Sequence, residues 1–151
     1  MERFTARYAD HTKIDKGMYI AKIDGDITVY DLRFCRPNGT RFLTRAEEHT
    51  LAHLYESLFA DMRDDSFLWF AASPSGSGFY LVMRGAAHSK AIKAVADATE
   101  KIACWEGKIP CVSAEECSDI ESHDIEGAKK WAQVFLPKVR NLTQDMLEYP
   151  A

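Results

Sequence analysis

The sequence predicts an α+β fold, in which a mostly antiparallel sheet packs against helices in a single domain. Two observations lead to this prediction. Residues 18–35 and 67–85 each contain two apolar runs rich in strand-forming residues, separated by turn residues, as in β-hairpins. The segments between and after these hairpins have the 3.6-residue periodicity of amphipathic helices. Hairpins interleaved with helices are typical of α+β proteins, whose sheets are antiparallel.

The first half of the chain is predicted to hold both hairpins and one helix. The strands MYIAKID and DITVYDLRFC are expected to turn at Asp24 and Gly25. After the loop RPNGT, a helix is predicted from Arg45 to about Arg63, because Thr44 and Glu47 have the spacing of a capping box. The second hairpin pairs FLWFAASP with GFYLVMRG across SGSG.

Two further helices complete the predicted fold. One runs from Ser89 to about Trp105, and glycine and proline follow its end. The other, DIEGAKKWAQVFL, is expected to end at Pro137, because proline lacks the N–H that continues a helix. Between them, SAEECSD is predicted to form a turn or a short helix. A chain of 151 residues suffices for one domain with a core and falls short of two, so residues 1–151 are taken as one domain.

Composition excludes several classes of protein. The net charge is −4 with acids and bases interspersed, which gives no basic surface for nucleic acid. The sequence contains no run of 18 apolar residues that would predict a membrane span. The start of the chain, MERFTARYADHTK, lacks the apolar stretch of a signal peptide, so a cytoplasmic protein is expected. In that reducing compartment the 4 cysteines are expected to be thiols or ligands rather than disulfides.

The helix from Arg45 carries a candidate metal site. One side has an apolar stripe that should pack on the sheet: Leu51, Leu54, Tyr55, Leu58 and Met62. His49, His53 and Glu56 fall on the opposite side, where imidazoles four residues apart can reach one ion. Cys117, in the polar segment SAEEC, is a candidate third ligand of a zinc-like ion. The same spacing also fits two solvated histidines, and spacing alone leaves both interpretations open.

Several blocks of sequence together resemble one family. DHTK, DLRFCRPN, HTLAHL, the Ser-Pro turn before GFYLV, and EEC followed by HDIEGAKKWA occur in this order from about Asp10 to Leu136. They resemble the S-ribosylhomocysteine lyases, the LuxS-type enzymes of autoinducer synthesis in quorum sensing. The resemblance implies a divalent iron or zinc ion held by His49, His53 and Cys117. It also implies a cytoplasmic homodimer with its sites at the subunit interface, in which Arg33 and His11 contact a small thioether substrate.

The resemblance is incomplete at the positions of the residues that transfer protons in the family's enzymes. The family's enzymes shift a carbonyl along a ribose and then eliminate homocysteine, with a metal as Lewis acid and with a glutamate and a cysteine as proton carriers. Here the helix reads His-Thr-Leu-Ala-His, so Ala52 replaces the glutamate. The family's cysteine-containing loop is shortened to Ser-Pro-Ser-Gly-Ser-Gly, in which Ser77 is a candidate replacement for the cysteine. Lyase activity is therefore expected to be weak or lost.

Two residues keep alternative interpretations. Glu56, one turn beyond His53, is a candidate relocated base or a fourth ligand, and also fits an ordinary charged residue on a helix. Arg33 also fits an exposed strand arginine. Three functions follow: an S-ribosylhomocysteine lyase with altered groups, a non-catalytic relative that binds a metal and a ribosyl or thioether ligand, and a different metal-dependent hydrolase that uses Glu56.

Overall fold

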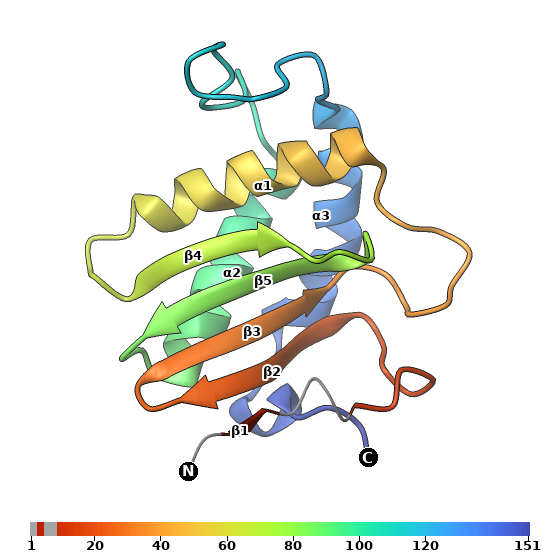
Figure 1. The fold of residues 1–151 in the computed structure, drawn as a ribbon, viewed down its shortest axis with the longest axis vertical. Helices are drawn as coiled ribbons and strands as arrows, with labels where there is room; N and C mark the ends of the chain where they lie inside the picture. The colour runs from red at the N-terminus through yellow and green to blue at the C-terminus, as the bar shows by residue number, and fades with distance from the viewer. Residues whose placement is uncertain (1–2, 5–8) are drawn as a thin grey trace.

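The computed structural model describes residues 3–4 and 9–151. Its centre is an antiparallel sheet with the strand order β1-β2-β3-β5-β4. Helices α2 and α3 lie side by side against one face of this sheet, and α1 runs along its β4 edge (Figure 1). The strands are β1 (Arg3–Phe4), β2 (Gly17–Asp24), β3 (Ile27–Arg33), β4 (Phe67–Ala72) and β5 (Gly78–Arg84). The predicted α+β class with an antiparallel sheet is confirmed.

The first hairpin turns one residue later than the sequence predicted. Asp24 pairs with Ile27, so the two-residue loop is Gly25 and Asp26 rather than Asp24 and Gly25. Gly25 has φ 58°, in the left-handed region, which suits a two-residue hairpin loop that begins with glycine. The second hairpin, β4–β5, forms across the serine-glycine loop as predicted.

Helix α1 (Arg45–Ala60) begins as predicted and ends three residues early. The Thr44 side chain accepts from the Glu47 N–H, and the Glu47 carboxylate accepts from the Thr44 N–H, which completes the capping box. Leu51, Leu54 and Tyr55 are fully buried, so the predicted apolar stripe packs into the core. The opposite side of α1 is left to face the segment between α2 and α3.

The last helix contradicts the predicted boundary. Helix α3 (Ile125–Arg140) continues through Pro137, where the sequence predicted its end. Proline removes one backbone hydrogen bond, but the last turn is held by tertiary contacts. Val139 is fully buried, and Arg140 contacts Glu100 at 3.4 Å on helix α2 (His88–Ala103).

A single aromatic-rich core joins the sheet to the three helices. Phe34, just after β3, stacks on Phe135 of α3 with ring centroids 4.0 Å apart and an interplanar angle of 16°. Tyr55 of α1 meets the same Phe34 edge-on. This packing fixes α1 relative to α3, and therefore fixes the residues that these helices and their connection carry. No helix in the described part of the chain is long and apolar enough to cross a membrane.

Candidate metal centre

Four potential metal ligands converge beside the outer face of α1. His49 and His53 come from the helix, and Cys117 and His123 come from the segment between α2 and α3. One ligand atom from each residue lies within 4.8 Å of those of the other three. The structure thus brings together the three ligands predicted from the sequence and adds His123, which that prediction missed.

Local contacts fasten the connecting segment to α1. Cys117 ends a turn in which its N–H donates to the Ser113 carbonyl at 2.9 Å. Arg45, in the first turn of α1, pairs with Asp119 at 3.1 Å. The Thr50 hydroxyl accepts from the Asp124 N–H at 2.9 Å, just before α3 begins. The two sides of the candidate site are therefore held together without an ion.

The hydrogen bonds of His49 and His53 fix which nitrogen can bind a metal. His49 Nδ1 lies 2.8 Å from the Ser122 carbonyl oxygen, and His53 Nδ1 lies 3.0 Å from the Pro110 carbonyl oxygen. A carbonyl oxygen only accepts, so each Nδ1 carries the proton and each neutral ring presents a bare Nε2. These two Nε2 atoms lie 3.0 Å apart, so two lone pairs face one another. A metal ion bound to both atoms, or a proton on one of them, would remove the repulsion between the lone pairs.

The separations between the ligand atoms match a tetrahedral ion. Metal–sulfur and metal–nitrogen bonds of about 2.3 and 2.0–2.1 Å put sulfur and nitrogen about 3.6 Å apart and two nitrogens about 3.3 Å apart. Cys117 Sγ lies 3.5 Å from His49 Nε2, and His49 Nε2 lies 3.0 Å from His53 Nε2. Imidazole and thiolate donors suit iron, cobalt or zinc rather than calcium or magnesium. The residues present therefore fit a divalent transition metal.

His123 is connected differently from the other two histidines. Its Nδ1 lies 2.9 Å from the Thr50 hydroxyl, whose oxygen already accepts from the Asp124 N–H. The Thr50 hydroxyl can donate to Nδ1, and in that tautomer Nε2 carries the ring proton and faces Cys117 Sγ at 3.7 Å. Burial, followed by repulsion from His49 and His53 whenever these are protonated, lowers the pKa of His123, which favours a neutral ring. With the proton on Nε2, His123 would donate a hydrogen bond to the cysteine sulfur, and with a bare Nε2 it would be a fourth potential ligand.

The predicted substrate residues line a separate cavity of about 520 Å³. Its lining includes Arg33, His11 and Ser77, and none of the four residues of the metal group. Arg33 is only 8% exposed, so it is not the solvated strand arginine that the sequence also allowed. Its Nε donates to Asp31 at 2.8 Å, and Nη1 lies 3.5 Å from the Ser77 hydroxyl. The arginine is thereby held against the shortened loop.

Two residues of α1 bear on proton transfer. Ala52, where the resemblance places a glutamate, packs against the core and offers no titratable group. Glu56 is exposed and is not one of the four residues that converge. The structure does not bring Glu56 into the group, so its role as base or ligand stays a prediction.

The fold is α+β, and the group of histidines and a cysteine beside α1 could hold a metal ion, as in metalloproteins with histidine and cysteine ligands. Comparison with known proteins narrows this class. The model of the S-ribosylhomocysteinase (LuxS) family matches residues 4–146, so the chain belongs to that family. The resemblance seen in the sequence is confirmed.

Named relatives cover most of the chain. The S-ribosylhomocysteine lyase of Thermus thermophilus is 38% identical over an alignment of 136 residues, and the match covers 84% of each chain. That of Clostridium beijerinckii is 31% identical over 158 residues, and that of Finegoldia magna is 27% identical over 155, each across 99% of both chains.

His123, which the sequence prediction missed, could have been recognised from the sequence. His123 opens the block HDIEGAKKWA, which carried part of the family resemblance, and it lies six residues after Cys117. A histidine this close to a candidate thiolate ligand, in a block shared with the family, could have been included in the site.

Proposed function

We propose that this protein binds one divalent iron or zinc ion through His49, His53 and Cys117 and cleaves S-ribosylhomocysteine as a carbon–sulfur lyase. We further propose that it does so much more slowly than relatives with both proton carriers. The observation that carries the proposal is the pair of bare Nε2 atoms beside the Cys117 sulfur, in a chain of the LuxS family. The relatives of Thermus thermophilus and Clostridium beijerinckii are S-ribosylhomocysteine lyases, and from them the proposal takes the substrate and the reaction class.

The residues of the metal group have different roles in the proposed binding of the metal. His49 and His53 present Nε2 because the Ser122 and Pro110 carbonyls hold their Nδ1 protons. Cys117 binds as the thiolate, and the N–H of His123 stabilises the charge on its sulfur. Held by His49, His53 and Cys117, a bound metal would supply Lewis-acid polarisation of a substrate carbonyl.

Substrate binding is assigned to the cavity of Arg33 and His11. Asp31 fixes the guanidinium of Arg33, which leaves donors directed at the cavity for hydroxyl or carboxylate oxygens of the substrate. Because this cavity contains no residue of the metal group, we propose that a homodimer combines the metal group of one subunit with the cavity of its partner. That arrangement is the one the family resemblance implies.

The slow rate follows from what replaces the proton carriers. Ala52 cannot accept a proton, and the hydroxyls of Ser75 and Ser77, 2.6 Å apart, are much weaker acids than a thiol. Each lost general acid or base costs roughly 10²–10⁴ in rate. Neither alternative function has a specific contact in its favour, since Glu56, the base that a hydrolase would need, is exposed outside the group.

The proposal is tested by release of free thiol from S-ribosylhomocysteine, using protein purified without oxygen and loaded with iron. We expect slow, metal-dependent turnover, below that of a relative with the glutamate and the cysteine by at least about 10²-fold. Ala52→Glu combined with Ser77→Cys should raise the rate, and Ala60→Glu on the same helix is a control for added charge. Turnover equal to the relative's, or none even in the restored variant, would contradict the proposal.

A further inference from the structure

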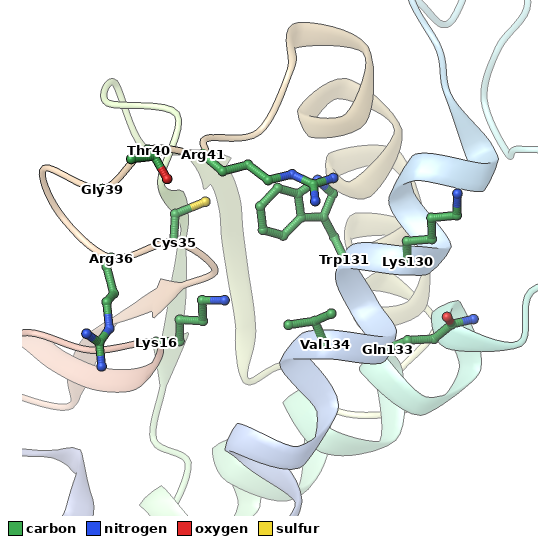
Figure 2. A pocket seen from close by; sticks show the side chains of 10 residues that line it. All are labelled: Lys16, Cys35, Arg36, Gly39, Thr40, Arg41, Lys130, Trp131, Gln133 and Val134. Carbon is green, nitrogen blue, oxygen red and sulfur yellow. The ribbon is translucent and has the colours of Figure 1, made fainter.

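A second cavity, of about 560 Å³, lies between α3 and the loop that follows β3. Figure 2 shows this cavity, with Trp131 and Val134 on the α3 side and Cys35 and Lys16 on the other. It shares no lining residue with the cavity of Arg33 and His11 and none with the metal group. Its volume is within the range of small-molecule sites, about 300–1,000 Å³.

The described lining of this cavity is strongly cationic. It includes Lys16, Arg36, Arg41 and Lys130 and no carboxylate, in a chain with 23 acidic and 19 basic residues. Arg36 is neutralised by Asp15, to which it donates at 2.9 and 3.2 Å. The other three cations make no ion pair with a described carboxylate. An anion in the cavity would relieve the repulsion among them.

An aromatic wall stands beside these charges and is held in place. The Arg41 guanidinium lies 5.0 Å from the centre of the Trp131 ring, a cation–π contact. The Trp131 Nε1–H donates to the Glu47 carboxylate at 2.6 Å, which fixes the plane of the indole. Val134 is 52% exposed at the rim and adds apolar surface to the same side. Trp131 itself is only 6% exposed, so a flat organic group would meet the Arg41 guanidinium held over the ring and the Val134 side chain, while its anionic end meets the cations.

We propose that this cavity binds a small organic phosphate with a flat ring, of about the size of a nucleoside monophosphate. A guanidinium together with ammonium groups suits a phosphate dianion better than a single carboxylate charge. The ring would lie against Val134 and the guanidinium of Arg41 that covers Trp131, and the phosphate would lie near Lys16 and Lys130. The site is independent of the metal group and of the proposed lyase reaction.

Calorimetry with adenosine 5′-monophosphate at low salt tests the proposal, with adenosine and inorganic phosphate as matched probes. We expect saturable binding of the monophosphate, with adenosine and phosphate each at least about tenfold weaker. The titration is repeated on the His53→Ala variant, which is expected to lack metal, so that phosphate bound to an ion is excluded. Equal affinity in that variant supports a separate site, and loss of binding there overturns the proposal.

Charge variants locate the site. Lys130→Glu should weaken binding about tenfold, whereas Lys129→Glu makes the same charge change on the neighbouring residue outside the cavity and should leave binding within about twofold. Arg41→Gln should also weaken binding, with an unchanged melting temperature as evidence of folding. Equal effects of the two lysine variants, no saturation at millimolar monophosphate, or free phosphate binding as tightly as the nucleotide would overturn the proposal.

Discussion

At the scale of single residues, the protonation of three imidazoles separates ligands from supporting groups. His49 and His53 donate hydrogen bonds from Nδ1 to carbonyl oxygens, which leaves Nε2 free for a metal. His123 instead meets a hydroxyl at Nδ1, and because a hydroxyl can donate there, Nε2 is able to carry a proton toward the Cys117 sulfur. The partner of the far nitrogen therefore decides what the near nitrogen can do, although all three rings lie within one small group.

Removal of one ligand should empty the site. In His53→Ala, two protein ligands remain, and two ligands hold a divalent ion too weakly to survive purification, so metal content should fall well below one ion per chain. Glu56→Gln, one turn away on the same helix, should keep the metal. Metal analysis of both variants after gel filtration makes the comparison. A full complement of metal in His53→Ala would refute the proposed site, and loss of metal in Glu56→Gln would make Glu56 a ligand.

His123 should tune the metal site without holding the ion. His123→Ala removes the hydrogen bond to the Cys117 sulfur, so metal affinity should fall about 10–100-fold while one ion per chain still binds at saturation. In cobalt-loaded protein the thiolate-to-cobalt absorption should move to longer wavelength, because the sulfur is more electron-rich. His123→Gln, which retains an N–H donor, should restore part of this shift. Failure of His123→Ala to bind metal at saturation would show that His123 is a ligand.

At the scale of elements, the start of α1 and the middle of α3 are joined through one carboxylate. Glu47 accepts from the Thr44 N–H with one oxygen and from the Trp131 indole with the other. Both Glu47 and Trp131 are 6% exposed, so this carboxylate depends on its protein donors. The capping box at the start of α1 is thereby tied to α3. It lies just before His49 in the sequence, and α3 begins just after His123.

Trp131→Phe tests this connection. The variant keeps a ring but leaves a buried carboxylate oxygen without its donor, which should cost about 1–3 kcal/mol of unfolding free energy. Trp105→Phe is the control, because its indole N–H donates to the Lys108 carbonyl at an exposed position and should cost less than about 1 kcal/mol. Urea unfolding of metal-free protein measures both. Equal losses for the two variants would mean that the Glu47 contact does not hold the helices together.

At the scale of the whole molecule, the metal group and the cavity of Arg33 and His11 are separate features of one chain. The cavity belongs to the strand ends, the loop after β3 and the β4–β5 turn, whereas the metal group belongs to α1 and the α2–α3 connection. In a two-fold symmetric homodimer, the metal group of each subunit could face the cavity of its partner. Such a dimer would contain two equivalent complete sites.

Mixed dimers test that arrangement. His53→Ala should lack metal and His11→Ala should bind S-ribosylhomocysteine weakly, so neither variant alone gives full binding sites. When the two are co-expressed, random pairing should leave about a quarter of the sites with both features intact. Calorimetry with the substrate counts these sites, and light scattering checks the dimer mass. A monomeric mass, or no intact sites in the mixture, would contradict a shared site.

The sequence by itself determined the features that repeat over short distances. The Thr44–Glu47 spacing predicts the start of α1, and the pair His49 and His53 follows from the helical period alone, because residues four apart share a face. Strand-forming runs around turn residues predict the hairpins, with an error of one residue at Gly25. The family resemblance added Cys117, which spacing could only suggest as a ligand.

Only the tertiary structure decided what depends on contacts between distant segments. Cys117 lies 68 residues after His49, and the Thr50 hydroxyl meets an imidazole 73 residues away, so no local pattern records either contact. The helix continues through Pro137 because packing of its last turn against α2 outweighs a local signal. Arg33 is buried because Asp31 compensates its charge within the fold. Backbone periodicity is local, whereas ligand geometry, burial and charge pairing arise only when the chain is packed.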